Sequence, residues 1–332
     1  MKTAGGSSGG ACFNENLEFI GVHQARFDTI SRFVPAELFV DSIREIVGKD
    51  VAPPTLWSLD GTPTGPLVIG RSPFFRAIAA AGDPQGRVRG VRIKRTNLDA
   101  TSTGLGYSHD ILQQLLVRRG PEHRLVRIEL DEVIDDLIAG IRSKARLAGL
   151  DLPDPLADEA GIAPGQAPPE TTIKNRAENL AAAIQAAAAT AGVTVWMFFD
   201  NPSVVLKDAS LLAIESFVGA ALAKPHLRLV IAGMETVSLP GAEFLGPPAS
   251  EGDRSPGLIV DFVGEFRRAD VLDLLSLASR ELTGDVDDAK LDWSVDMALV
   301  GLANTNGLYD PDLLPEVASR LRAALQVLAG GV

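Results

Sequence analysis

The chain has 332 residues, of which 46% are hydrophobic and 22% charged, and its formal net charge at pH 7 is -12. This composition is typical of a globular protein with a substantial core, and the acidity argues against a protein that coats nucleic acid. The sequence has one cysteine, Cys12, no secretory signal and no apolar run long enough for a membrane span, so we expect a cytoplasmic protein.

The N-terminal part of the chain predicts a tail, then helices, then a linker. Residues 1–11 are rich in glycine and serine and predict a flexible tail. Between 12 and 65 we expect a helical region over 16–48 followed by a proline- and glycine-rich linker over 50–66. The helical pattern rests on apolar residues spaced three and four apart, many of them phenylalanines. Those phenylalanines either pack on the core or dock another chain, and the sequence leaves both alternatives open.

Residues 66–263 alternate between helix and strand patterns. Helices are expected over 71–81, 108–117, 131–147, 172–190 and 208–223, and strands over 87–95, 123–130, 193–200, 227–232 and 258–263. This alternation predicts an α/β domain with a doubly wound, mainly parallel sheet of about five strands. Residues 149–169 form a loop insertion, and 264–332 form a helical C-terminal region. In such sheets ligands bind beyond the carboxyl ends of the strands.

A glycine-containing segment follows the first of these strands, where a phosphate-binding loop would lie. It contains Gly104, Gly106, Tyr107 and Ser108 directly before the predicted helix. In a phosphate loop of the form G-x-x-x-x-G-K-[ST], the lysine contacts the β and γ phosphates and the hydroxyl binds Mg²⁺. Here Tyr107 stands at the lysine position and Thr101 at the first glycine, while Ser108 keeps the hydroxyl. The segment therefore predicts a degenerate phosphate loop.

A second motif is the apolar run V-T-V-W-M-F-F-D, which ends in Asp200. A buried strand that ends in aspartate is typical of a Walker B motif, in which the aspartate holds Mg²⁺. Many ATPases carry a second acid next, but this chain has Asn201. Asp200 is thus a candidate magnesium ligand if a Mg-nucleotide binds, and the alternative is that its carboxylate caps the following turn.

The order of these motifs carries a resemblance to a known class. Residues 66–263 resemble the NTPase module of the STAND class, P-loop signalling ATPases related to the AAA+ group. The stretch P-L-V-I-G-R resembles the F-x-G-R opening of that class, S-H-D-I-L-Q-Q-L resembles the helix after its phosphate loop, and L-R-L-V-I-A-G-M resembles the strand near its sensor residue. The helices after residue 267 match its helical appendage.

The departures from this pattern imply an inactive member. Tyr107, Thr101 and Asn201 replace expected catalytic residues, and no arginine follows Gly233 as a sensor. Inactive STAND-like modules work in bacterial signalling and defence beside effectors such as peptidases. The resemblance therefore implies an adaptor or sensor with a protein partner, no catalytic residues and no cofactor. The alternative is an atypical ATPase switch that binds ATP and Mg²⁺, with Lys94, Arg95 or another basic residue replacing the missing lysine.

A local excess of basic residues interrupts the acidic chain. Residues 87–127 contain nine lysines and arginines but three acids, and the basic residues alternate with apolar ones along the first strand. A core strand with this pattern is unexpected, so we predict either an edge strand or pairing with acidic groups. The alternation puts Arg87 and Arg89 on one face and Arg92 and Lys94 on the other, unless Gly90 marks a bulge. A nucleic-acid-associated regulator is the second alternative function, although interleaved aromatic residues are lacking.

Overall fold

The computed structural model divides into two compact units, residues Met1–Pro53 and Pro54–Val332, which are described separately. The residues it describes are 10–16, 18–27, 30–40, 55–84, 86–96, 105–133, 136–154, 169–200, 206, 208–235, 237–239, 241–245, 255–284 and 287–330.

The first unit contains an antiparallel sheet instead of the predicted helices. Strands β1 (Ala11–Phe13), β2 (Phe19–Phe27) and β3 (Ile30–Pro35) pair in the order β1-β2-β3, and a short 3-10 helix, η1 (Ala36–Leu38), follows. The prediction of helix is therefore wrong for residues 19–27 and 30–35. Apolar spacings of three and four also occur in strands, and the aromatic and β-branched content of this stretch favours pairing. Residues 41–54, which complete the predicted helices, lie outside the described residues.

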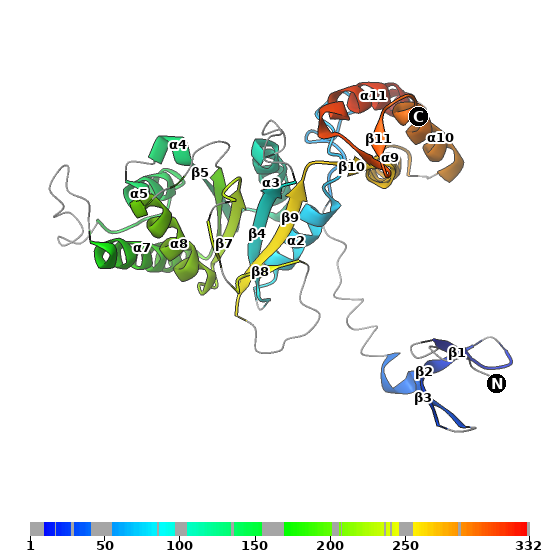
Figure 1. Ribbon diagram of the computed structural model, residues 1–332, viewed down its shortest axis with the longest axis horizontal. Helices are drawn as coiled ribbons and strands as arrows, with labels where there is room; N and C mark the ends of the chain where they lie inside the picture. The colour runs from blue at the N-terminus through cyan, green and yellow to red at the C-terminus, as the bar shows by residue number, and fades with distance from the viewer. Residues whose placement is uncertain are drawn as a thin grey trace. The chain divides into compact units, whose positions relative to one another are not determined.

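The second unit is built on a six-stranded sheet with the order β5-β6-β7-β4-β9-β8, in which every pair of neighbours is parallel (Figure 1). Its strands are β4 (Val88–Arg95), β5 (His123–Glu129), β6 (Thr194–Asp200), β7 (Leu227–Ala232), β8 (Glu243–Phe244) and β9 (Gly257–Val263). The predicted α/β sheet is confirmed, with β8 as a short additional strand. Strands β6 and β7 are buried on both faces, as their continuous apolar runs predict.

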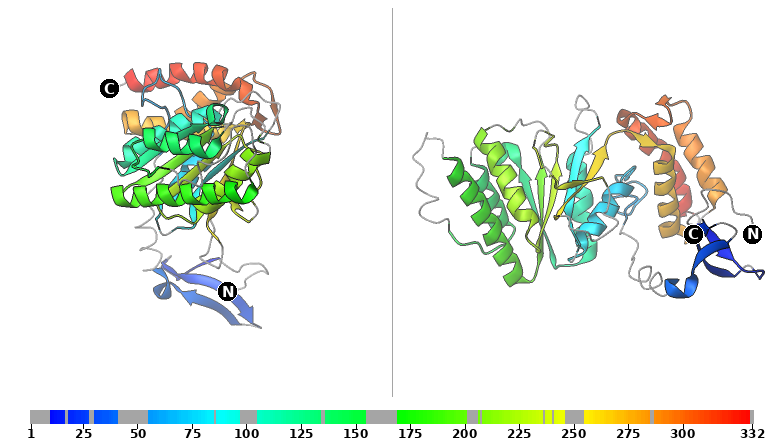
Figure 2. Two further views of the ribbon diagram at one scale, coloured as in Figure 1. Left: turned by 90° about the vertical axis from the view of Figure 1, so that its left-hand side faces the viewer. Right: turned by 60° about the horizontal axis from the view of Figure 1, so that its bottom comes forward.

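Helices cover both faces of this sheet, which makes it doubly wound (Figure 2). The helices are α2 (Ser72–Gly82), α3 (Leu105–Arg119), α4 (Leu130–Val133), α5 (Leu137–Leu147), α7 (Glu170–Ala191) and α8 (Asp208–Leu222). Apolar side chains of α5, α7 and α8 pack on one face, and those of α2 and α3 pack on the other. The helix predicted over 131–147 is divided into α4 and α5.

Three helices after the sheet form a bundle with its own core. They are α9 (Arg268–Thr283), α10 (Asp288–Leu299) and α11 (Leu314–Gly330). A small sheet of β10 (Phe266–Arg267), β12 (Leu308–Tyr309) and β11 (Asn304–Thr305) and the 3-10 helix η2 (Pro311–Leu313) complete the region. The bundle core joins these helices to Trp57 and Leu67, which precede the sheet domain in the chain. Among the described residues, no helix has the length and apolar character needed to cross a membrane.

Candidate functional site

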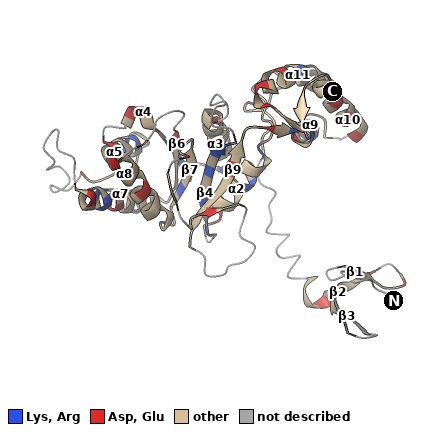
Figure 3. Cartoon of the chain, viewed as in Figure 1, with Lys and Arg blue, Asp and Glu red and all other residues tan. Residues whose placement is uncertain are grey.

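The basic strand β4 lies in the middle of the sheet, between β7 and β9. The alternative of an edge strand is therefore wrong, and the structure shows how a central strand carries these charges (Figure 3). The fully buried Arg92 donates hydrogen bonds to the backbone oxygens of Met234 and Val237. Lys94 Nζ lies 2.6 Å from the Glu243 carboxylate. The loops and strands around β4 thus supply acceptors to the side chains of Arg92 and Lys94.

A second ion pair lies at the carboxyl end of β4, where the predicted phosphate loop begins. Arg95 donates from Nε and Nη2 to the two carboxylate oxygens of Glu235, at 2.8 and 3.0 Å. Burial raises the pKa of Glu235, but the hydrogen bonds from Arg95 outweigh it and lower the pKa below its usual value. Because Arg95 and Lys94 already bind carboxylates, neither is positioned as a free substitute for the missing lysine.

The structure describes three of the four predicted phosphate-loop residues, and all three lie in a helix. Gly104 falls outside the described residues, as do the other residues of 97–104. Gly106, Tyr107 and Ser108 belong to the first turns of α3, which begins at Leu105 and not at Ser108 as predicted. Ser108 is completely buried. These three positions are thus the start of a packed helix, and the phosphate loop before it stays a prediction.

Tyr107 has a structural contact of its own. Its hydroxyl donates a hydrogen bond of 2.9 Å to the backbone oxygen of Leu67, in the segment that precedes α2. The ring packs against the core on the α2–α3 face of the sheet. Burial raises the pKa of the Tyr107 phenol, so the side chain remains neutral. A phosphate loop has its lysine at this position. Here Tyr107 instead links α3 to the segment before α2 through its hydrogen bond to Leu67.

Replacing Tyr107 with phenylalanine tests this contact. We expect the free energy of unfolding to fall by about 1 kcal/mol, because the backbone oxygen of the buried Leu67 loses its donor while the ring packing remains. Urea unfolding of the two proteins measures the difference. Tyr309→Phe is the matched control, since no described residue hydrogen-bonds the Tyr309 hydroxyl; equal losses in both variants would contradict the role given to Tyr107.

Asp200 ends β6 as predicted, but an arginine already holds its carboxylate. Asp200 is buried, and its Oδ2 lies 2.6 Å from Nη2 of Arg127 on the neighbouring strand β5. The same guanidinium lies 3.2 Å from Glu129, which is paired with Asp200 in the sheet register. Partial burial lowers the pKa of Arg127, but the hydrogen bond and charge of Asp200 and the charge of Glu129 raise it overall. Arg127 thus neutralises two carboxylates that end adjacent strands.

Arg127 is the residue of this site that sequence reasoning missed. It lies two positions before the acidic end of β5, so its side chain shares a face with Glu129. The signal was the R-I-E ending of β5 beside the F-D ending of β6. These two sequence endings predict the ion pair only when β5 and β6 are known to be neighbours and their register is known.

Among the described residues, Asp200 and Ser108 do not fit a Mg²⁺–triphosphate site in this arrangement. The Asp200 carboxylate is bound to Arg127, and Ser108 is shielded from solvent in α3. A magnesium ion prefers one or two carboxylates together with water and phosphate oxygens. Asp200 is the predicted metal ligand. The guanidinium of Arg127 places a positive charge beside its carboxylate, where a metal ion would have to bind.

A pocket of about 490 Å³ lies beside Tyr107. Its walls come from the segment before α2, the end of β9, η2 and α11, and they are mostly apolar, with Phe262, Leu314 and Ala318 among the lining residues. Charged residues on the wall are Arg71, Glu265, Asp312 and Arg322. The volume is within the range of small-molecule sites. The pocket lies between the α/β sheet and the helical bundle, next to the first turn of α3.

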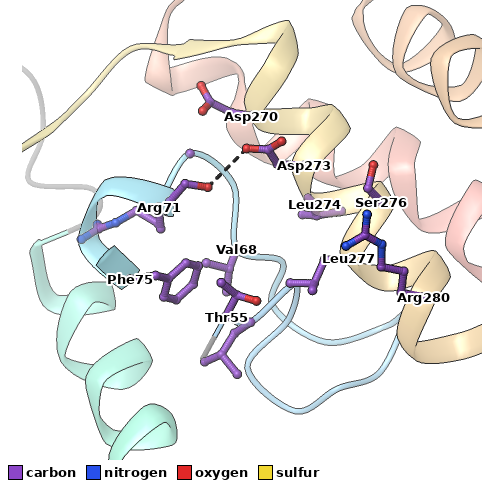
Figure 4. Close-up of a pocket in the computed structure, with 13 residues that line it drawn as sticks. Thr55, Val68, Arg71, Phe75, Asp270, Asp273, Leu274, Ser276, Leu277 and Arg280 are labelled. Carbon is purple, nitrogen blue, oxygen red and sulfur yellow. Dashed lines mark hydrogen bonds between the residues drawn. The ribbon is translucent and has the colours of Figure 1, made fainter. Parts of the chain in front are cut away.

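A smaller pocket of about 310 Å³ lies between the segment before α2 and the face of α9 (Figure 4). Asp270 and Asp273 lie on its α9 wall, with Arg280 farther along the same helix. Both carboxylates have hydrogen-bond partners within the chain: Asp270 accepts from the backbone nitrogen of Arg267, and Asp273 from the hydroxyl of Ser72. Helix α9 thus contributes to this second, more polar cavity.

Comparison with known proteins gives little beyond the fold. No family model and no curated protein matches the chain. One solved structure that matches is the Walker-type ATPase paby2304 of Pyrococcus abyssi, with 13% sequence identity over 80% of this chain and 69% of that chain, at a TM-score of 0.35. The chain is an α/β protein with a parallel six-stranded central sheet, and its own residues must carry any functional conclusion.

Proposed function

We propose that the chain is a P-loop NTPase-like protein that does not hydrolyse nucleotide and acts as an adaptor or sensor through contacts with other proteins. The observation that carries this proposal is the ion pair between Asp200 and Arg127. The proposed relatives are the inactive STAND-like modules of bacterial signalling and defence systems, and the partner is an effector such as a peptidase or a sensor subunit.

Three features of the described residues support the absence of catalysis. Arg127 holds the carboxylate that would bind the metal, the hydroxyl at the second metal position is buried, and the neutral Tyr107 stands where a lysine would neutralise phosphate. Phosphoryl transfer depends on positioned charge, because stabilising the transferred group is most of the catalysis. At these described positions Tyr107 is neutral, and the guanidinium of Arg127 is paired with the carboxylates of Asp200 and Glu129.

The test is ATP turnover by the full chain with Mg²⁺. We expect turnover at the background rate, unchanged by Asp200→Ala, because Asp200 has a structural partner and no catalytic role. Asp131→Ala is the matched control, since Asp131 is an exposed acid near the end of β5. Turnover well above background that Asp200→Ala abolishes and Asp131→Ala leaves intact would refute the proposal.

A second candidate function is an atypical nucleotide-binding switch, and the pocket of about 490 Å³ favours it. An apolar pocket of this size accommodates a planar base, and the nearby N-terminus of α3 favours an anionic group. Calorimetry with ATP, with and without Mg²⁺, tests this function, and Ala318→Trp would fill the pocket. No heat at millimolar nucleotide, or equal binding by Ala318→Trp, would exclude the pocket as a nucleotide site.

A further inference from the structure

Helix α10 carries an apolar stripe on its solvent side. Trp293, Met297 and Val300 are 66%, 50% and 59% exposed. Their spacing of four and three residues places them on one side of the helix and its C-terminal end. We refer to these three residues as the outer stripe. Trp57 and Trp196, the other two tryptophans of the chain, are buried.

The outer stripe is distinct from the face that α10 buries. Leu291, Val295, Ala298 and Leu299 of α10 are buried in the core that it shares with α9 and α11. At 3.6 residues per turn these residues point to the opposite side of the helix from Trp293 and Met297. A helix that is apolar on two opposite faces is typical of one that is covered on both sides. The bundle covers only the inner face.

The flank of the outer stripe is acidic. Asp292 and Asp296 lie one turn apart along one side of it, and both bind Arg268 of α9, at 2.8 and 2.9 Å. All three side chains are substantially exposed, so these ion pairs contribute little to stability and remain accessible to a partner. Residues 287–300 contain four carboxylates and one lysine, and Arg268 adds one further positive charge, so the acids remain in excess. A partner with positive charge beside its apolar face complements this surface.

A second copy of the chain fits this surface less well. If α10 packed against its own copy, each apolar contact would bring the acidic flanks of both helices into the same interface. Like charges placed together disfavour association. A single convex helix with apolar residues at such spacing is suited instead to pack along another helix.

We propose that the outer stripe of α10 is a docking surface for a basic amphipathic helix of another protein, with lysines or arginines flanking its apolar face. The stripe supplies a tryptophan and a methionine, residue types that are enriched in interface cores. The inference goes beyond the absence of hydrolysis, because it depends neither on the nucleotide pocket nor on Asp200. A failure of one proposal therefore leaves the other untouched.

The test uses two synthetic helical peptides of about five turns. One has an apolar leucine face flanked by lysines, and the other replaces each lysine with glutamate. We expect the lysine peptide to bind the full chain saturably by fluorescence anisotropy, and more weakly at high salt. It should also protect tryptophan emission from acrylamide, because Trp293 is the exposed tryptophan. The glutamate peptide should not bind.

Two double variants test whether the lysine peptide binds at the outer stripe. We expect Met297→Ser/Val300→Ser to weaken binding by roughly tenfold or more, because truncation at an interface core is costly. The control is Val117→Ser/Leu147→Ser, which removes two even more exposed apolar side chains from α3 and α5 and should bind as the parent chain does.

Four results would overturn the proposal: no binding of the lysine peptide, equal binding of both peptides, full binding by the α10 variant, or a dimer of the parent chain that the α10 variant abolishes. The last would show that a second copy covers the stripe.

Discussion

Gly90→Ala is expected to lower the free energy of unfolding by roughly 3 kcal/mol or more, since overpacking against rigid backbone cannot relax. A Cβ at this position would lie 1.7 Å from the backbone oxygen of Leu229 on β7. Gly90 also has a φ of 148° at a register shift between β4 and β9. Urea unfolding followed by circular dichroism measures the loss.

Gly219→Ala is the matched control for Gly90. Gly219 lies in α8, and an added Cβ there would have no neighbour within 4 Å. That variant is expected to gain roughly 0.5–1 kcal/mol, because glycine is unfavourable inside a helix. A Gly90→Ala protein that is soluble and as stable as the parent chain would show that β4 and β7 can separate to admit a methyl group.

Arg71→Met is expected to destabilise the chain by roughly 3–5 kcal/mol, because it leaves a buried charge without its partner. Nη2 of Arg71 lies 3.1 Å from Oδ2 of Asp261 on β9, and both side chains are buried. The guanidinium also lies 4.7 Å from the ring centre of Phe74. Replacing both charged residues, as in Arg71→Met/Asp261→Leu, should recover most of the loss, since apolar side chains need no charge partner there.

The Arg71→Met defect should depend on pH. Burial raises the pKa of Asp261, and the charge of Arg71 lowers it in part. A raised pKa means that the folded chain binds the proton more tightly than the unfolded chain, so stability falls as pH rises through the folded value. Without Arg71 this pKa rises further. The deficit, measured by urea unfolding, should be larger at pH 7 than at pH 4.5, and a deficit independent of pH would contradict this account of Asp261.

Sequence patterns predicted the core of the sheet, because a strand that is buried on both faces has a continuous run of apolar residues. The continuous apolar runs of β6 and β7 are strands covered by helices on both sides, and the alternation of helix and strand indicated the parallel sheet. In the first unit the apolar spacing predicted helices, but the structure has strands β2 and β3. Short apolar spacings suit both a helix face and a strand, and only pairing with a neighbour distinguishes them.

The sequence by itself determined the α/β class, the parallel sheet and the placement of Asp200 at a strand end, because these follow from local periodicity. Only the tertiary structure decided what the charged residues do. It placed basic β4 in the centre, where Glu243 and Glu235 pair with Lys94 and Arg95, and it set Arg127 against Asp200. Each of these pairs joins residues from different strands or loops, and spacing along one strand holds no information about the strand beside it.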